Sequence, residues 1–385
     1  MVDIQIKTSD LKKALSIASL AIGDNPDTVE GQALFIIKND KVFIQATNKD
    51  KLAASYFPLI DSSVEAECSF TTDPKKLQAV LSKSDEDLIK IQHNQERNTL
   101  NVFASEDKEA YISFPSMNPD DFLKINEELS IALSVKTIDT TILTTGIRFI
   151  LGFLPNDEKS KKYSNLYIDK GILYGSNGAN KVGAFSSSDL EGITDLNIRR
   201  SMLMPTASFI DKIGSSEIVL KHSSKNIIVS SPDGFHSFGF RKSILEMPKL
   251  PISIMVPDAN GINIDRQLLL KKITRLGITS RDELGLKLSV TGEVLSIKTM
   301  AERESFERIA CTRVCGEQPF EFLLECKRFK VILTMFQSDF VNLYVDKTRC
   351  TVYNNGDFIV EEEGKDPVKK PFIEVGVVTL ARPER

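Results

Sequence analysis

The chain has 385 residues, 41% of them apolar and 26% charged, and its formal net charge at pH 7 is −4. These values are typical of a soluble globular protein with two or three domains. No apolar run approaches the ~18 residues that a membrane span needs. Residues 1–7 are strand-like and lack the basic and then apolar pattern of a signal peptide. We therefore expect a cytoplasmic protein.

The five cysteines are odd in number and widely spaced, which favours reduced buried thiols over a disulfide framework. They are Cys68, Cys311, Cys315, Cys326 and Cys350. The pair at 311 and 315 could begin a metal site, but no second pair and no nearby histidine completes the four ligands that zinc requires. The spacing also fits alternate positions on a strand. We expect neither a metal nor a cofactor.

The first third of the chain begins with a strand at 4–6 and a helix over 9–18, for which Ser9 or Asp10 offers an N-cap. Apolar residues of this helix recur at helical spacing, at Leu11, Ala14, Leu15 and Ala18. A strand at 41–45 ends in the octet Ala-Thr-Asn-Lys-Asp-Lys-Leu-Ala. A second helix begins at Asp73 and Pro74, a cap followed by a proline in the first turn. Alternating strands follow.

The same order of elements returns twice. A strand at 131–135 and a helix from 139 precede the octet Ser-Asn-Gly-Ala-Asn-Lys-Val-Gly at 176–183, and Pro205 opens the next helix. A third, more divergent copy has helices from 266 and from 324. A period of roughly 125–130 residues is that of a whole domain. The sequence predicts three similar α+β domains, 1–127, 128–256 and 257–385, each with two helices on one face of antiparallel sheet.

Positive charge gathers in the six predicted helices. Their windows together carry +8, so the rest of the chain carries −12. A basic helical face on an acidic protein is typical of contact with phosphates, although Lys and Arg are also common on solvated helices. No aromatic residue is interleaved, which indicates backbone contact without base stacking. The candidate DNA-facing residues are Lys12, Lys13, Lys76, Lys83, Arg148, Lys212, Lys271, Lys272, Arg275, Lys327 and Lys330.

Motifs for catalysis are missing from the sequence. Gly171, Gly175 and Gly178 follow a strand, but no helix with apolar periodicity opens after them, as a dinucleotide fold requires. There is no Walker motif, and the three histidines form no triad or metal motif. Acidic runs at 120–121 and 361–363 leave open a carboxylate–metal nuclease, although adjacent surface carboxylates are usually only solvated. We expect a protein that is not an enzyme.

With its three-unit layout, its two octets and Asn-Pro-Asp-Asp-Phe at 118–122, the chain resembles the bacterial-type sliding clamp, the beta subunit of DNA polymerase III, over its full length. Where the family has His-Arg-Leu, this chain has Asn180, Lys181 and Val182. Its tail at 377–385 lacks the usual Met-Pro-Met-Arg. The differences suggest a remote or phage-encoded member.

The resemblance implies a ring of two chains around sequence-independent duplex DNA, which tethers a replicative polymerase and binds a clamp loader through short peptides. The implied peptide pocket, between the second and third domains, comprises Asn177, Asn180, Lys181, Val182, Pro248, Val377, Val378, Thr379, Leu380 and Arg382. The alternative is that 377–380 is simply a terminal strand. The implied dimer interface joins Tyr111 and Ser113 to Leu276 and Ile278. A clamp-fold scaffold without a processivity role, such as a transcription-coupling clamp, is the rival function.

Overall fold

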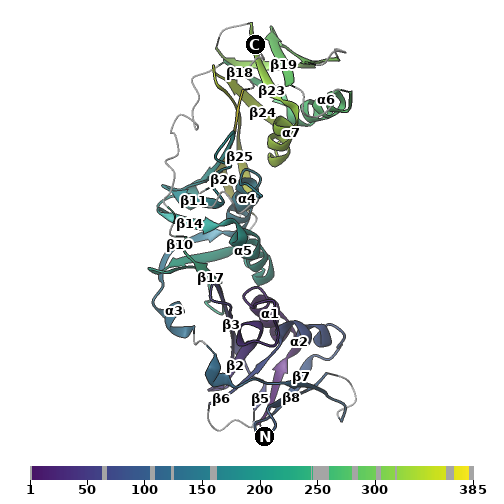
Figure 1. The fold of residues 1–385 in the computed structure, drawn as a ribbon. Helices are drawn as coiled ribbons and strands as arrows, with labels where there is room; N and C mark the ends of the chain where they lie inside the picture. The colour runs from purple at the N-terminus through teal and green to yellow at the C-terminus, as the bar shows by residue number, and fades with distance from the viewer. Residues whose placement is uncertain are drawn as a thin grey trace. The chain divides into compact units, whose positions relative to one another are not determined.

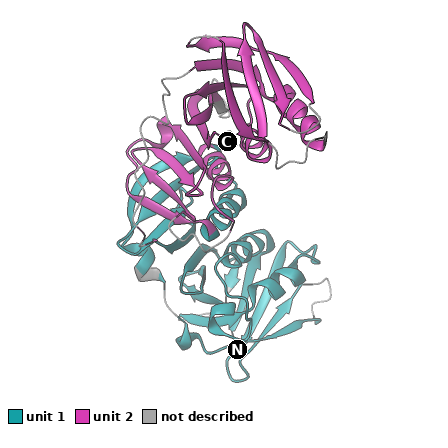
Figure 2. Cartoon of the chain, turned by 45° about the horizontal axis from the view of Figure 1, so that its top comes forward, with its two compact units in different colours: residues 1–141, 201–242 teal, residues 142–200, 243–385 magenta. Residues whose placement is uncertain are grey.

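The computed structural model describes residues 2–62, 67–104, 109–122, 125–156, 163–243, 245, 260–279, 285–300, 305–316, 319–360 and 368–380. The chain divides into two compact units, and each unit combines separate stretches of sequence (Figure 2). Unit 1 comprises Met1–Thr141 and Ser201–Lys242, and unit 2 comprises Ile142–Arg200 and Ser243–Arg385.

Six of the described helices have eight or more residues (Figure 1). They are α1 (Thr8–Ala18), α2 (Pro74–Leu81), α4 (Thr140–Leu151), α5 (Arg200–Ile213), α6 (Arg266–Thr279) and α7 (Cys326–Met335). A short helix, α3 (Asn126–Ser130), follows the first third of the chain. The predicted start of α5 at Pro205 is wrong, because the helix begins at Arg200 and contains the proline. Nor does Ser9 or Asp10 cap α1, which begins at Thr8.

Unit 1 contains two antiparallel sheets. The first has the order β5 (Asp61–Ser62), β1 (Val2–Lys7), β7 (Leu88–Asn94), β8 (Thr99–Phe103), β9 (Ile112–Pro115). The second has the order β10 (Leu133–Asp139), β15 (Glu217–His222), β16 (Asn226–Ser230), β17 (His236–Arg241), β4 (Lys51–Pro58), β3 (Lys41–Thr47), β2 (Ala33–Lys38), β6 (Cys68–Thr72). The pairing of β4 with β17 makes this eight-stranded sheet continuous.

Unit 2 repeats this plan. Its nine-stranded sheet has the order β14 (Leu196–Arg199), β11 (Asn165–Asp169), β12 (Ile172–Ser176), β13 (Lys181–Ser187), β26 (Val368–Thr379), β25 (Arg349–Val360), β24 (Phe340–Val345), β18 (Asn260–Asp265), β22 (Thr312–Cys315). Its second sheet has the order β21 (Phe306–Ala310), β20 (Val294–Thr299), β19 (Gly285–Thr291), β23 (Phe320–Glu325). Here β13 pairs with β26 in the way that β4 pairs with β17.

Backbone hydrogen bonds reveal the threefold repeat. The first N–H of α1, α4 and α6 donates to the carbonyl of the residue before β7, β15 and β24, at 2.9, 2.9 and 2.8 Å respectively; the pairs are Thr8–Asp87, Thr140–Ser216 and Arg266–Asp339. The strands before these helices (β1, β10 and β18) pair antiparallel with those same three strands. The α+β fold class is therefore confirmed, whereas the three domain boundaries stay a prediction. Contacts divide the chain into two units because two of the sheets join strands of successive copies.

Apolar helix faces form the cores. The predicted positions Leu11, Ala14, Leu15 and Ala18 are all buried, and α1 packs on β3, β4 and α2. In unit 2, α6 packs on α7 and β21. All five cysteines are free thiols. Burial raises the pKa of the Cys311 thiol, which suits an inert core residue.

Candidate nucleic-acid and partner interfaces

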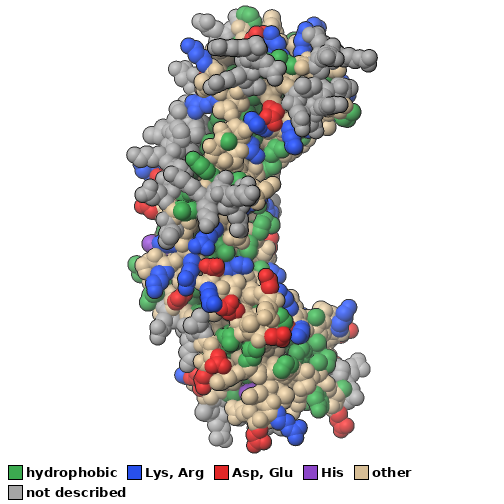
Figure 3. Space-filling view, viewed as in Figure 1, with side chains coloured by type: hydrophobic (Ala, Val, Ile, Leu, Met, Phe, Trp, Pro, Cys, Tyr) green, Lys and Arg blue, Asp and Glu red, His purple; other side chains and the backbone are tan. Residues whose placement is uncertain are grey.

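The helices of the structure are more basic than their predicted windows. Within their bounds, α1, α2, α4, α5, α6 and α7 contain fourteen Lys and Arg residues and only two Asp, so the rest of the chain carries a net charge of −16. Acidic residues that the predicted windows included, such as Asp73 and Glu325, lie immediately before the helices. In the view of Figure 3, positive and negative side chains are interspersed over both units. The excess of positive charge therefore lies on individual helices, and the face seen in Figure 3 shows no single basic patch.

On α1, both candidate lysines bind the ends of neighbouring helices. Lys13 Nζ donates to the carbonyl of Ile213, the last residue of α5, at 2.7 Å. Lys12 Nζ donates to the carbonyl of Ser84, just beyond α2, at 3.3 Å. Cations are stabilised near helix C-termini, where unpaired carbonyls carry partial negative charge. These two lysines thus have a structural role as well as a positive charge.

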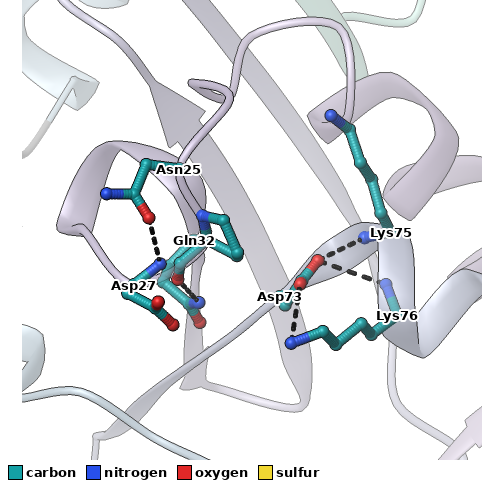
Figure 4. A network of polar contacts seen from close by, with 7 residues as sticks. Asn25, Asp27, Gln32, Asp73, Lys75 and Lys76 are labelled. Atoms are coloured by element: carbon teal, nitrogen blue, oxygen red, sulfur yellow. Dashed lines mark hydrogen bonds and ion pairs between the residues drawn. The ribbon is translucent and has the colours of Figure 1, made fainter.

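The start of α2 is fixed by its predicted cap (Figure 4). Asp73 Oδ1 accepts hydrogen bonds from the backbone N–H groups of Lys75 and Lys76 at 2.9 and 3.1 Å, and Asp73 Oδ2 lies 3.6 Å from Lys76 Nζ. A nearby loop is closed by Gln32 Nε2, which donates to the carbonyl of Pro26 at 2.5 Å. The side chain of Lys76 remains mostly exposed, as does Lys83 after the helix. Both lysines are available to an anionic partner.

On α6, the structure separates three neighbouring cations that the sequence grouped together. Lys271 is exposed. Lys272 Nζ lies 3.0 Å from Glu307 Oε2, and Arg275 donates to the other oxygen of the same carboxylate, which β21 supplies. Hydrogen bonds from Arg275 and Lys272 hold the pKa of Glu307 below its usual range. Glu307 could not be predicted as a partner of these cations from the sequence, because nothing in the local pattern links residue 307 to a helix about thirty residues earlier.

The remaining candidate cations lie on three helices. Arg148 on α4, Lys212 on α5 and Lys327 on α7 are exposed, and Lys330 on α7 is half-buried. A further α7 residue, Arg328, pairs with Glu325 at 2.7 Å. Arg266, which was not among the predicted site residues, is a buried arginine that donates to the carbonyl of Leu333 near the end of α7 at 3.3 Å. Its charge is used inside unit 2.

The hairpin between β12 and β13 brings the peptide-pocket candidates together. Asn177 Oδ1 accepts from the backbone N–H groups of Asn180 and Lys181 at 3.0 and 2.9 Å, which fixes the turn. β26 lies alongside, with Val182 opposite Val377 and Lys181 opposite Val378. Thr379 N–H donates to the carbonyl of Asn180 at 3.2 Å. Pro248 and Arg382 lie outside the described residues.

The predicted pocket residues at this hairpin and on β26 differ in how far they are buried. Val377 and Val378 are buried in β26, in the middle of the sheet, and both the pocket prediction and its terminal-strand alternative stay predictions. Thr379 is exposed, whereas Leu380, Val182 and Lys181 are half-buried. Lys181 Nζ lies 3.4 Å from the carbonyl of Gly152. Burial, together with the nearby charges of Arg328 and Arg200, lowers the pKa of the Lys181 ammonium group.

The candidate interface residues differ in exposure. Tyr111 and Ser113 are exposed at the start of β9. Ile278, near the end of α6, is 82% exposed, but Leu276 is 3% exposed and belongs to the core. Leu276 cannot touch a partner chain unless α6 rearranges. Of the two interface residues predicted on this helix, only Ile278 is therefore accessible to a partner.

The described residues contain neither a metal-binding cluster nor a membrane-spanning helix. In that part of the chain, no group of three or more His, Cys, Asp or Glu side chains is placed to hold a metal ion. Asp120 and Asp121 lie in a 3-10 turn, and residues 361–363 are outside the described part. None of the described helices is long and apolar enough to cross a membrane.

Comparison with known proteins finds similarity at the level of structure. No family model matches the chain, and no curated protein matches it. A DNA polymerase III beta subunit from Thermotoga maritima matches with a TM-score of 0.75 and 14% identity, over 100% of both chains. The corresponding subunit from Pseudomonas aeruginosa matches with a TM-score of 0.77 and 16% identity, over 99% of this chain and 100% of that one. A sliding clamp from Bacillus subtilis matches with a TM-score of 0.76 and 12% identity, over 100% of both. The likeness covers the whole chain and shows its fold.

Proposed function

We propose that this chain, which has the fold of bacterial DNA polymerase III beta subunits, is a DNA sliding clamp. Two copies form a ring around duplex DNA, and the ring tethers a replicative polymerase for processive synthesis in the cytoplasm. The clamp catalyses no reaction of its own. The observation that carries the proposal is the full-length match to clamps, supported by the repeated sheet plan of the two units.

The sheet edges support a head-to-tail dimer. The four-stranded half-sheets that end in β4, β13 and β21 are equivalent. The half-sheets that end in β17, β26 and β9 are equivalent as well, although β22 and β5 add a fifth strand to the last two. Within the chain, β4 pairs with β17 and β13 pairs with β26. Among the described strands, β21 and β9 each have one neighbour and lie at sheet edges. Pairing β21 of one chain with β9 of the other repeats the internal junction, and two such heterologous contacts close a ring.

Contact with DNA comes from the helices. Among the candidates, Lys76, Lys83, Arg148, Lys212, Lys271 and Lys327 have exposed side chains. Separate lysines and arginines attract phosphate without reading bases, and salt weakens each contact. Weak contacts of this kind allow a ring to slide. The acidic remainder of the chain disfavours DNA elsewhere.

Partner proteins bind at the β13–β26 junction, in a pocket shared by the second and third of three domains with the predicted boundaries. Exposed Thr379 and half-buried Leu380, Val182 and Lys181 offer apolar and polar groups side by side. Such mixed surfaces suit short linear peptides. A polymerase and a clamp loader would present these peptides in turn.

The test is extension of a primer on single-stranded circular DNA by the replicative polymerase and clamp loader of the source organism. Added clamp should lengthen the products, with the amounts of polymerase and template unchanged. Light scattering should give twice the chain mass of 42.9 kDa. A dimeric ring that leaves product length unchanged would identify a clamp-fold scaffold instead. A strict monomer at micromolar concentration would contradict the ring.

A further inference from the structure

The two junctions within the chain define how β21 and β9 correspond to the internal strands, residue by residue. The hairpins that lead into β4, β13 and β21 each close with one backbone hydrogen bond of 3.1 or 3.2 Å, accepted by the carbonyls of Lys51, Lys181 and Ser305. In each hairpin the residue after the acceptor pairs with the preceding strand; these residues are Leu52, Val182 and Phe306. Phe306 on β21 therefore corresponds to Leu52 on β4 and Val182 on β13.

The facing strands β17, β26 and β9 correspond in the same way. The carbonyls that accept the first N–H of α1, α4 and α6, at positions 87, 216 and 339, each lie six residues before a strand residue, respectively His93, His222 and Val345. Cross-strand pairs lead from these residues through β8, β16 and β25 to one residue on each facing strand: Phe114, Phe240 and Val378. Phe114 on β9 is thus equivalent to Phe240 on β17 and Val378 on β26.

Both internal junctions use the same register. Phe240 lies opposite Lys51, and Val378 lies opposite the equivalent Lys181. Because β21 and β9 lie at sheet edges among the described strands, the same register can form between β21 of one chain and β9 of another. It places Phe114 opposite Ser305. The next pairs along the strands are then Ser113–Phe306, Ile112–Glu307 and Tyr111–Arg308.

The Ser113–Phe306 pair matches a small residue to a large one. At the equivalent position within unit 1, Gly239 lies opposite Leu52, and a Cβ on Gly239 would come within 2.9 Å of Leu52 Cδ1. The glycine leaves room for the leucine. At the open edges, Phe306 is 44% exposed, and Ser113 is the small residue opposite it. A larger residue at position 113 would meet the phenylalanine ring.

The Ile112–Glu307 pair buries no unpaired charge. Lys272 and Arg275 already hold the Glu307 carboxylate, and the Glu307 side chain is only 11% exposed. Ile112 is 47% exposed. In this register the isoleucine loses exposed apolar surface while the carboxylate keeps its two partners. Burial of an ion without a partner would oppose association, so this pair is compatible with a stable interface.

The Tyr111–Arg308 pair joins a cation to aromatic rings on the other face of the sheet. Phe306 and Arg308 point away from α6, because side chains alternate along a strand and Glu307 between them binds that helix. The Arg308 guanidinium lies 5.1 Å from the centre of the Phe306 ring. Beside β9, Tyr111 packs on Phe103 with 5.5 Å between ring centres. The register brings Tyr111 next to Arg308, so the guanidinium gains a second aromatic ring, and such contacts are attractive.

We propose that the two open edges recognise a second copy of this chain in this single register, with the pairs Ser113–Phe306, Ile112–Glu307 and Tyr111–Arg308 across the junction. The proposal rests on the proposed function, because it specifies the residue contacts that close the ring. It also defines the partner. An unrelated apolar strand would lack the small residue opposite Phe306 and the aromatic ring beside Arg308, so these edges select copies of the chain itself.

Disulfide trapping in the full-length chain tests the register. Directly opposite residues have Cα atoms about 4.5–5.5 Å apart, which a disulfide spans, whereas diagonal neighbours are about 7–8 Å apart and beyond its reach. Tyr111→Cys combined with Arg308→Cys should therefore give a covalent dimer on mild oxidation. Tyr111→Cys with Phe306→Cys, two residues out of register, should give about tenfold less. The parent chain, with its five native thiols, is the control and should give none.

A size exchange provides a second measurement that needs no oxidation. Ser113→Phe should raise the dissociation constant of the dimer about tenfold, because two phenylalanine rings would compete for one position. Adding Phe306→Ser should restore most of the affinity. Light scattering across a concentration series gives the constants. A loss of affinity that Phe306→Ser does not restore would show that the two residues do not meet, and would overturn the register.

The outcomes of trapping distinguish the register from the ring. A dimer that is trapped equally well by both cysteine pairs, or better by the pair that is out of register, would overturn the register and leave the proposed function intact. A dimer that neither pair traps would do the same. A strict monomer of the parent chain would contradict the proposed function, and the register with it.

Discussion

Individual cations in this chain have different roles that their sequence positions do not reveal. Lys13 binds the end of α5, some 200 residues away, while Lys271 remains exposed. Lys272 and Arg275 share Glu307, whereas the sequence grouped them with Lys271 as one basic face. Long side chains reach partners that only the fold brings near, so a tally of charge on a helix overstates the charge available to DNA.

Reversal of neighbouring lysines separates these roles. Lys271→Glu should reduce the salt dependence of duplex binding by about one in the log–log slope, because each phosphate contact contributes about 0.9. The melting temperature of the Lys271→Glu variant should hardly change. Lys272→Glu should instead lower the melting temperature, since it places a second carboxylate beside Glu307. Fluorescence anisotropy at several salt concentrations and calorimetry measure the two effects, and identical behaviour of both variants would contradict the assignment.

A buried carboxyl on β26 makes stability depend on pH. Burial raises the pKa of Glu374 to about 7, against the opposing effects of the Asn354 hydrogen bond at 3.1 Å and the charge of Arg266. Because the folded pKa exceeds the unfolded value of 4.5, the folded state favours the protonated carboxyl. Its contribution to stability is fully present below the unfolded pKa and is lost as pH rises towards 7.

Glu374→Gln should therefore stabilise the chain at pH 8, by on the order of 3 kcal/mol, since one pKa unit corresponds to 1.36 kcal/mol. The gain should shrink as pH falls and vanish near pH 4.5. Denaturant unfolding at pH 5, 6, 7 and 8 measures it. A difference between variant and parent that does not change with pH would show that Glu374 titrates normally.

At the level of elements, glycines set how closely α4 approaches its sheet. A Cβ on Gly183 of β13 would lie 2.3 Å from the Phe153 ring, and one on Gly146 of α4 would lie 2.8 Å from Phe185. Both phenylalanines are buried. The small residues let the helix and the β12–β13 hairpin pack in contact. That hairpin carries the proposed partner pocket, so its position follows from this packing.

Gly183→Ala should destabilise unit 2, because the new methyl group overpacks a filled core and such changes typically cost about 1–3 kcal/mol. Gly23→Ala is the matched control in unit 1, since its Cβ would meet Glu30 at an ordinary 3.5 Å. Thermal unfolding followed by calorimetry compares them. Equal melting temperatures for the two variants would show that the core around Phe153 has room to relax.

For the whole molecule, two open sheet edges support the proposed assembly of two chains. Within the chain, β4 pairs with β17 and β13 pairs with β26. The strand equivalent to β4 and β13 is β21, and the strand equivalent to β17 and β26 is β9. Both β21 and β9 lie at sheet edges among the described strands. Exposed apolar side chains accompany both edges, at Ile112 on β9 and Phe306 on β21. Edge strands of this kind invite pairing with a second chain.

Ile112→Glu should convert the proposed dimer to a monomer, because a buried carboxylate without a partner opposes association. Ile60→Glu is the control, since Ile60 is comparably exposed but precedes β5, at the other edge of the same sheet. Light scattering across a concentration series gives the dissociation constants. A dimer that survives Ile112→Glu but fails with Ile60→Glu would move the interface to the opposite edge.

The sequence by itself determined the repeated plan. Apolar periodicity, the cap at Asp73 and the two octets are local signals, and they predicted the first helix of each copy, the second helices and the α+β class. The Pro205 helix start and the α1 cap were wrong, because proline is a strong local signal for the first turn of a helix and serine a strong cap signal, and the surrounding fold overrode both.

Only the tertiary structure decided how the copies join and which charged groups are used. The β4–β17 and β13–β26 pairings and the Glu307 ion pairs all connect residues far apart in sequence. The physical reason is that helical and strand periodicity depend on neighbouring residues, whereas sheet edges and ion pairs depend on which distant surfaces the fold brings into contact.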